Sequence, residues 1–224
     1  KMVGYVMNVA PLGVFGALCA VVAAKGLDIF KFYFIYYLFF LCGIALLWIL
    51  LLSAGYLILG RRMPRLLRRI GNPLLIAFST TSSEAVFPKL TEELERFGCR
   101  DRIVAFVLPL GYSFNLDGTT LYLAVASIFA AQAAGVELSW QQQLVMMLTL
   151  MVTSKGVAAV PRASLVILSG TLASFGLPLE AVAVILGVDE LMDMARTTVN
   201  LIGNCLATCV MARWEGEFAD NYNS

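Results

Sequence analysis

Charged and amide side chains near the C-terminus recur every three or four residues. The set comprises Asp189, Asp193, Arg196, Asn200 and Asn204. In an α-helix this spacing places neighbouring members on one face, and the residues between them are mostly apolar or small. A guanidinium binds a carboxylate bidentately, and a carboxylate binds an ammonium. Asp193 and Arg196 therefore match an acidic α-amino acid, which carries one ammonium and two carboxylates.

A purely structural ion pair between Asp193 and Arg196 is the alternative interpretation. Ionisable groups inside a bilayer each cost about 2.5–3.5 kcal/mol on insertion scales, so they pair and face a cavity. A structural pair leaves unexplained why the stripe continues as amides at Asn200 and Asn204. The pattern therefore favours a binding function.

A second polar motif, NLDGT, lies at residues 115–119 within an apolar segment. A carboxylate, an amide oxygen and the carbonyls of unwound backbone can together replace the water shell of a cation. The alternative is a glycine-kinked helix with an incidental Asp117, although an unpaired aspartate at that depth is costly. Ser82, Ser83 and Gly156–Pro161 lie where loop tips are expected, and free backbone amides at such tips can receive a carboxylate.

The chain that carries these groups is too apolar for a soluble domain. Its 224 residues are 60% hydrophobic and 14% charged, the mean hydropathy is +0.83, and a soluble domain of this size needs a polar shell. A net charge of +1 does not suggest nucleic acid, and the absence of histidine removes Ser-His-Asp and Cys-His catalysis. The five cysteines contain no C-x-x-C pair, so we expect buried apolar roles for them.

Apolar stretches of roughly 20 residues predict membrane-spanning helices. We expect spans at about 9–24, with a kink at Pro11, and at 32–59, 103–134 and 179–210. The third span is interrupted by GYSFNLDGTT, and the last holds DELMDMARTTVN in its middle. Five arginines at 61–69 predict a cytoplasmic anchor under the positive-inside rule, rather than a nucleic-acid site. Because the sequence opens in an apolar stretch, we interpret it as part of a longer polypeptide.

Two shorter apolar stretches predict re-entrant hairpins. Residues 70–78 are too short to span and lead through STTSSE into a charged segment, while residues 144–152 reach TSKGVAAVPR before an apolar return. A hairpin followed by a broken helix thus occurs at about 70–134 and again at 141–213, entering from opposite sides. Such an inverted repeat is typical of secondary transporters, and non-helical backbone at membrane depth is tolerated only around a protein-enclosed or wet cavity.

The motifs closely resemble those of the dicarboxylate/amino acid:cation symporter family, which includes the glutamate transporters. They are STTSSEAVFP, PLGYSFNLDGTTLY, TSKGVAAVPRASLVIL and DELMDMARTTVNLIGN, and the resemblance that they carry extends over 70–204. The resemblance implies an all-α membrane protein with two re-entrant helical hairpins in an inverted repeat. It divides the chain into three parts. Residues 1–62 would contain family helices five and six, and residues 63–134 the first hairpin and helix seven. Residues 135–224 would contain the second hairpin and helix eight. The family's first four helices, which form a scaffold, are absent from this sequence.

The resemblance also implies roles for single residues. Asp193 would hold the substrate amino group and Arg196 its side-chain carboxylate, while the second hairpin would close as the extracellular gate. The other substrate contacts would come from Ser82, Ser83, Thr119, Val160, Thr197 and Asn200. The cation positions would be lined by Gly111, Ser113, Asn115, Asp117, Asn200 and Asn204.

Two departures from the family pattern bear on the coupling ion. Sodium-coupled members usually carry a carboxylate where this chain has Asn204, and Lys155 stands beside a usual sodium position. An amide binds sodium more weakly than a carboxylate does, and an ammonium repels it. We therefore predict proton coupling, with Glu84 and Asp117 as candidate carriers, because a carboxylate removed from water can hold a proton. The alternatives are sodium at Asn115, Asp117, Asn200 and Asn204, and a Lys155 that only snorkels to water.

The resulting expectation is a multi-pass symporter of glutamate or aspartate in the inner cell membrane, with H⁺ or Na⁺ as coupling ion and no other cofactor. It would work as a homotrimer by an elevator movement against the missing scaffold helices, surrounded by the lipid bilayer and without nucleic acid. A C4-dicarboxylate carrier is an alternative, although such a substrate offers Asp193 no ammonium. An ion channel leaves two opposed hairpins unexplained. A hydrolase built on Ser154 and Lys155 has no recognisable oxyanion site, so we expect no enzyme activity.

Overall fold

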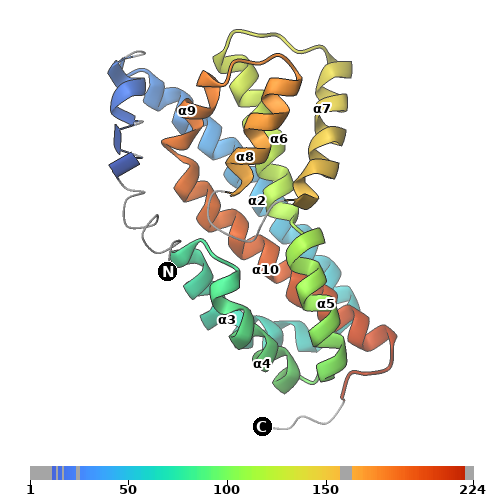
Figure 1. Ribbon diagram of the computed structural model, residues 1–224. Helices are drawn as coiled ribbons and strands as arrows, with labels where there is room; N and C mark the ends of the chain where they lie inside the picture. Colours follow the sequence, from blue (N-terminus) through green and yellow to red (C-terminus); the bar gives the residue numbers. More distant parts are fainter. Residues whose placement is uncertain (1–11, 14, 17, 24–25, 157–162, 220–224) are drawn as a thin grey trace.

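The computed structural model describes residues 12–13, 15–16, 18–23, 26–156 and 163–219. Within these ranges the regular structure is helical, apart from one isolated β-bridge between Cys99 and Phe218 (Figure 1). The predicted all-α fold is therefore confirmed. The expected first span at about 9–24 lies only partly within the described residues, and those parts of it are helical. Pro11 lies outside them.

The longest helix is α2, Ile29–Leu59, and it presents a broad apolar surface to the outside. Phe34 is 69% exposed and Leu57 is 85% exposed. Two largely helical stretches, Ile29–Thr80 and Asp101–Ala133, are long and apolar enough to cross a membrane by length and composition. Exposed apolar surface on this scale is typical of a lipid-facing or partner-facing helix.

The first predicted hairpin corresponds to α3, Met63–Thr80, and α4, Phe87–Phe97, which pack against each other. The short 3₁₀ turn Gly60–Arg62 leads into α3, and a second, Glu84–Val86, leads into α4. Thr81 ends α3 in the left-handed region, with φ of 50°. The second half of the arginine run lies in the first turns of α3, so this helix begins before the apolar stretch at 70–78.

The third predicted span is broken where the NLDGT motif begins. Helix α5 runs over Asp101–Phe114 and α6 over Asp117–Ala133, and neither Asn115 nor Leu116 has helical backbone angles. The motif therefore interrupts the helix as predicted, and it leaves the carboxyl end of α5 facing the amino end of α6.

The C-terminal part forms a second pair of short helices and then the long central helix. Helix α7, Trp140–Thr153, begins with a capping box made by Ser139 and Gln142 and continues into the 3₁₀ turn Ser154–Gly156. Helices α8, Ala163–Ser174, and α9, Glu180–Leu186, precede α10, Asp189–Trp214. Residues 157–162, which include Val160 and Pro161, lie outside the described residues.

One expectation about the last span is wrong. The segment DELMDMARTTVN does not lie in the middle of the helix but forms the amino-terminal half of α10. The helical stretch that starts at α9 is interrupted at Gly187 and Val188, and the new helix begins with Asp189 and Glu190. Two acidic residues in a first turn are favourable because the amino end of a helix carries partial positive charge.

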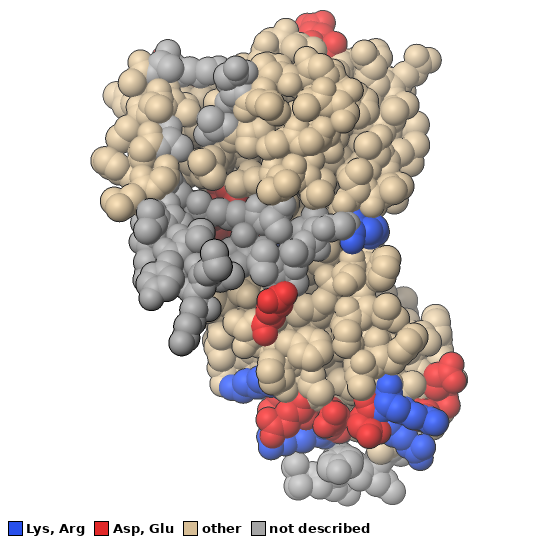
Figure 2. All heavy atoms as spheres, viewed as in Figure 1, with Lys and Arg blue, Asp and Glu red and all other residues tan. Residues whose placement is uncertain are grey.

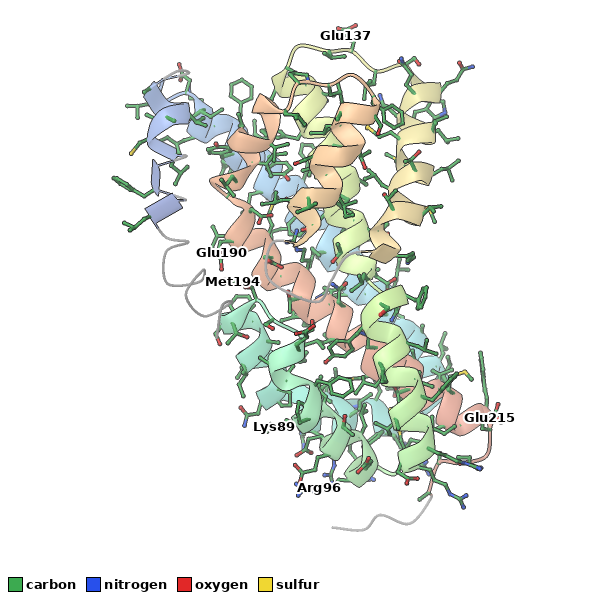
Figure 3. The ribbon with its side chains drawn as sticks, in the orientation of Figure 1. Lys89, Arg96, Glu137, Glu190, Met194 and Glu215 are labelled. Carbon is green, nitrogen blue, oxygen red and sulfur yellow. The ribbon has the colours of Figure 1, made fainter. Side chains whose placement is uncertain are left out.

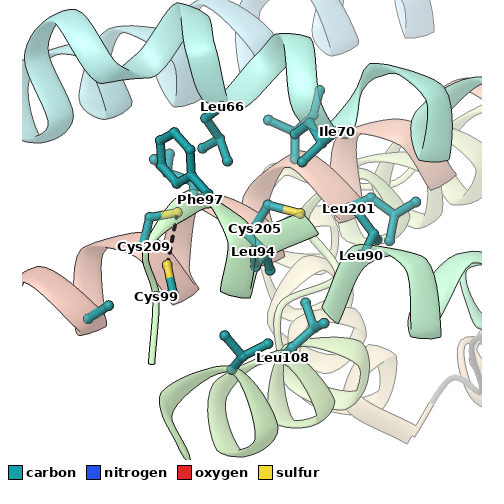
Figure 4. Close-up of a cluster of buried hydrophobic side chains, with 14 of the residues drawn as sticks. Leu66, Ile70, Leu90, Leu94, Phe97, Cys99, Leu108, Leu201, Cys205 and Cys209 are labelled. Atoms are coloured by element: carbon teal, nitrogen blue, oxygen red, sulfur yellow. Dashed lines mark hydrogen bonds between the residues drawn. The ribbon is translucent and has the colours of Figure 1, made fainter. Parts of the chain in front are cut away.

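Helix α10 crosses the middle of the molecule and packs against α2, α3, α5 and α6 (Figure 1). It joins two buried apolar clusters. One, partly drawn in Figure 4, combines α3, α4 and α5 with Leu201, Cys205 and Cys209 of α10. The other combines α6, α7 and α8 with Met192 and Val199. The polar stripe lies along the same part of α10 as these apolar contacts.

The cysteines only partly follow our expectation. Cys99, Cys205 and Cys209 are buried, and the Sγ atoms of Cys99 and Cys209 are 3.7 Å apart (Figure 4). Cys19 and Cys42 are exposed instead. Cys42 lies on α2, whose outward face has no covering helix among the described residues.

Charged side chains gather at one end of the molecule. Lys89, Arg96 and Glu215 lie at this end, whereas Glu137 lies at the opposite end (Figure 3). In the face shown in Figure 2, the surface between the ends is mostly uncharged. Ion pairs hold the charged end together, including Arg69 with Glu93 at 3.6 Å. This banded distribution is typical of a protein that spans an apolar layer.

Candidate binding site at the broken helix

The polar stripe of α10 faces the protein interior. Asp189, Asp193, Arg196, Thr197, Asn200 and Asn204 are all buried, and Thr197, at 5%, is the most exposed of them. Glu190 and Met194 lie on the adjoining, half-exposed side of the helix (Figure 3). The predicted inward orientation of the stripe is therefore confirmed.

Arg196 lies within a compact group of charges. Its Nε donates a hydrogen bond of 2.9 Å to Asp193 Oδ1, which also accepts from the Thr197 hydroxyl at 3.2 Å. Arg196 Nη1 lies 3.6 Å from Asp189 Oδ1 and makes no hydrogen bond among the described residues. The guanidinium also stacks over the Tyr122 ring, 4.1 Å from its centroid. One cation is thus shared by two buried carboxylates and an aromatic face.

Two members of this group were missed as site residues. Asp189 belongs to the predicted stripe, but its spacing alone does not indicate that it faces the same guanidinium as Asp193. Tyr122 lies on α6, and no motif marks it as a neighbour of Arg196. An aromatic residue shortly after a polar helix break is a weak signal, because most such residues simply fill the core.

Asn200 ties the beginning of α6 to α10. Its Nδ2 donates to the Thr119 hydroxyl at 2.9 Å, and its Oδ1 accepts from the Gly118 backbone N–H at 2.8 Å. The amide thereby satisfies one of the backbone donors that the amino end of a helix leaves unpaired. Thr119 and Asn200, both predicted substrate contacts, are therefore brought together.

The predicted cation residues also meet at the break. A hydrogen bond of 2.9 Å links the side-chain amides of Asn115 and Asn204. Either the oxygen or the nitrogen of Asn115 can face the Asp117 carboxylate. With the nitrogen facing Asp117, it lies 3.1 and 3.2 Å from the two carboxylate oxygens. The Asn115 oxygen then faces Asn204, whose amide must turn as well so that its Nδ2 donates to Asn115 Oδ1. Two amides and one carboxylate thus converge here.

Two glycines permit this close packing. A Cβ on Gly111 would lie 2.5 Å from Asn204 Oδ1, and one on Gly203 would lie 3.1 Å from Asp117 Oδ2. Both distances are shorter than ordinary van der Waals contacts, so a side chain at either position would displace the polar groups beside it. Gly111, a predicted cation-site residue, therefore lies directly beside Asn204.

Other predicted residues are not brought to this cluster. Ser113 and Glu84 are exposed, and Ser82 is half-buried. Ser83 is buried, but its carbonyl accepts from the Tyr112 hydroxyl at 3.0 Å. In the described part of the chain no hydrogen bond joins the Ser82 or Ser83 side chain to α10. Their substrate contacts, the contact predicted for Val160, and the proton-carrier role of Glu84 stay predictions.

Ser154 and Lys155 form hydrogen bonds with different residues. The Ser154 hydroxyl donates to Met151 O at 3.1 Å and lies 3.3 Å from the Thr120 hydroxyl. The Lys155 ammonium donates to Phe114 O at 2.7 Å. A hydrolase would need the lysine to accept the serine proton, and this geometry does not aim one at the other.

We expect Gly118→Ala to lower the thermal stability of the full-length protein. An added Cβ would lie 2.8 Å from Arg196 O and 3.0 Å from Arg196 Cα, and backbone atoms cannot move aside as a side chain can. Overpacking of this kind costs about 1–3 kcal/mol. Thermal unfolding in detergent measures the loss. Gly170→Ala is the control, because a Cβ there meets nothing within 4 Å. Equal melting temperatures for the two variants would contradict the close approach.

The sequence is similar to that of known proteins. The family model described as "Sodium:dicarboxylate symporter family" matches residues 1–214. The proton/sodium-glutamate symport protein of Bacillus subtilis (strain 168) is 46% identical over 219 residues, which cover 97% of this chain and 51% of that protein. The proton/glutamate-aspartate symporter of Escherichia coli (strain K12) is 44% identical, with 97% and 50% covered.

A relative that is named for another substrate is almost as similar. The C4-dicarboxylate transport protein of Bacillus subtilis (strain 168) is 42% identical over 224 residues, covering 97% of this chain and 52% of that protein. The chain spans about half the length of these curated relatives. Identity alone therefore does not separate amino acid from dicarboxylate substrates.

Proposed function

The chain belongs to the sodium:dicarboxylate symporter family, and on that premise we propose that the full-length protein is a secondary active symporter for glutamate or aspartate. It is accordingly a membrane protein of a transporter family. The observation that carries the proposal is the buried group of Asp193, Arg196 and Asp189 on α10, beside the broken helix. In this group Arg196 would bind the side-chain carboxylate of the substrate, and Asp193 would bind its ammonium.

The charge of this group supports coupling to a cation. Two carboxylates against one guanidinium leave one negative charge, and an acidic amino acid, with two carboxylates and one ammonium, adds a second. Uncompensated charge inside a low-dielectric region is costly, so the loaded site favours a bound cation or proton. Asp117, Asn115 and Asn204 lie at the break and form the candidate position for it.

Among the coupling ions we propose the proton. Asn204 supplies an amide where a carboxylate would bind sodium more strongly. Sodium at Asn115, Asp117, Asn200 and Asn204 is the alternative, and both ions occur in the names of relatives.

A C4-dicarboxylate carrier is the second candidate function, because a relative of that name is 42% identical. Asp193 argues against it. A buried carboxylate repels a substrate that carries two carboxylates and no ammonium, unless another cation neutralises it.

The exposed apolar faces support a position within the membrane beside further helices. We infer that the outward face of α2, with Phe34 and Leu57, is covered by lipid or by the scaffold helices of the same polypeptide. The α3–α4 and α7–α8 pairs would be re-entrant hairpins of an inverted repeat. This unit would move as an elevator within a homotrimer of the inner membrane.

Uptake of labelled aspartate by the full-length protein in liposomes tests the proposal. We expect an inward proton gradient to drive accumulation above the external concentration in sodium-free medium. Accumulation that follows only a sodium gradient at fixed pH would overturn proton coupling. Passive equilibration under both gradients would overturn the symporter itself, and would favour a channel.

A further inference from the structure

The carboxyl end of α5 is capped by a lysine from a distant segment. In an unbroken helix the N–H of Gly118 would donate to Phe114 O, the carbonyl four residues earlier. Here that N–H donates to Asn200 Oδ1, at 2.8 Å. Phe114 O receives the Lys155 ammonium instead, at 2.7 Å. Lys155 therefore occupies the backbone acceptor that the break exposes.

The charges at the break match the ends of the two half-helices. The carboxyl end of a helix carries partial negative charge and favours a cation, whereas the amino end favours an anion. Lys155 lies at the end of α5, and Asp117 is in the first turn of α6. Both side chains line one cavity of about 390 Å³, together with Thr120 and apolar residues of α2. The cavity thus contains one fixed ammonium and one carboxylate.

We propose that Lys155 is a tethered cation that takes the place of one dissolved monovalent cation at the broken helix. A carbonyl oxygen and a nearby carboxylate are the ligands that a sodium ion uses. The ammonium occupies the carbonyl and repels a second positive charge brought close to it. Lys155 thereby determines ion specificity: transport would need one dissolved cation fewer than it would with a neutral residue at this position.

This inference rests on the proposed symport function and deepens it by naming a residue that sets the ion requirement. A lysine that only snorkels to water would extend its ammonium into solvent, where no single acceptor fixes it. Lys155 is exposed, but its ammonium donates to one backbone atom, Phe114 O. If only the hydrogen bond matters, a neutral side chain that still donates to Phe114 O should behave as Lys155 does. If the positive charge matters, such a side chain should change the ion requirement.

The test compares Lys155→Met, Lys155→Gln and Lys155→Arg in the full-length protein in liposomes. Labelled aspartate uptake is measured at one fixed proton gradient, with external sodium chloride or choline chloride. For Met and Gln we expect the sodium-to-choline uptake ratio to rise at least about tenfold above the wild-type ratio, because the vacated carbonyl can then bind sodium. Arg keeps the charge and should keep the wild-type ratio. Lys89→Met, on α4 at the charged end, is the matched control.

Glutamine separates hydrogen bonding from charge, because its amide can still donate to Phe114 O. A Gln variant with the wild-type ratio would overturn the proposal, and so would uptake lost equally in both salts by a variant that still folds. A second readout needs no transport. Sodium chloride, compared with choline chloride, should raise the melting temperature of Lys155→Met and Lys155→Gln but not that of the wild type. If the wild type carries no acidic amino acid, the symport proposal fails, and this melting comparison still decides the fate of Lys155.

Discussion

Replacing Arg196 with methionine is expected to lower the affinity of the full-length protein for aspartate by about 100-fold or more. A guanidinium that binds a carboxylate bidentately makes two charge-assisted hydrogen bonds, each contributing about 1.5–3 kcal/mol. Arg196 Nη1 is buried and makes no hydrogen bond among the described residues, so it is a donor available to such a ligand. Losing both bonds removes about 3 kcal/mol or more, and 1.4 kcal/mol corresponds to a factor of ten.

The same substitution also affects stability. Without Arg196, Asp189 and Asp193 lose the cation that they share, and breaking a buried ion pair by removing one partner costs about 3–5 kcal/mol. Arg196→Lys is therefore the informative companion. Its ammonium keeps the charge between the two carboxylates but cannot form two parallel bonds to a ligand. It should fold and still bind aspartate much more weakly than the wild type.

Calorimetric titration of the purified protein with aspartate, together with initial uptake rates, measures these effects. Arg213→Met is the matched control, because Arg213 lies on the same helix but is exposed and bonds to Ile58 O at its far end. Neutral amino acids such as alanine have no second carboxylate, so the loss should be much smaller for any of them that bind. Aspartate affinity within threefold of wild type in both Arg196 variants would contradict the assigned role.

The parts of the site that follow from local geometry were predictable from the sequence. The spacing of Asp193, Arg196 and Asn200 places them on one helix face whatever surrounds the helix. In an apolar protein that face must turn inward, because exposing it to lipid is costly. The NLDGT motif likewise predicts a helix break, since Asn115 and Gly118 both disfavour a continuous helix. These features depend on residues close together in the chain.

The cross-helix partners were not predictable in the same way. Tyr122 stacks on Arg196, and Asn200 accepts from Gly118, only because α6 and α10 pack at a particular register. That register depends on how the apolar side chains around the stripe pack, and no single sequence motif predicts it. The exposed Ser113 illustrates the opposite case. It lies within a polar motif, but helical rotation turns it away from Gly111 and Asn204.

Element boundaries were wrong where one residue type serves two purposes. Arginine suits a cytoplasmic anchor and is also a good helix former, so the run by itself does not show that α3 begins at Met63, within it. Asp189 was placed within a helix, although an acidic residue is also favourable in a first turn. The structure uses it there, and from that position its carboxylate reaches Arg196.

Asp193→Ser is expected to reduce binding of aspartate by about 100-fold while changing binding of succinate by less than about fivefold. A buried carboxylate that contacts an ammonium contributes several kcal/mol through its charge and hydrogen bonds. Succinate has no ammonium, so it loses no such contact. In the wild type Asp193 should in fact repel it. We therefore propose that Asp193 distinguishes the two substrate classes named for the relatives.

The structure adds one consequence to this substitution. Asp193 Oδ1 accepts from both Arg196 Nε and the Thr197 hydroxyl, so removing it also loosens the guanidinium. Asp193→Asn separates the two effects, because the amide oxygen can still accept from both donors but carries no charge to attract an ammonium. Asp193→Asn should thus lose aspartate binding almost as fully as serine does, with Arg196 held in place.

Competition between labelled aspartate and unlabelled succinate on the full-length protein measures both affinities together. Glu215→Gln, at the exposed far end of α10, should behave as the wild type. A preserved or improved succinate affinity together with a lost aspartate affinity identifies Asp193 as the ammonium partner. Equal losses for the two ligands would instead mean that the residue only positions Arg196, and the preference for amino acids would then have to arise elsewhere in the site.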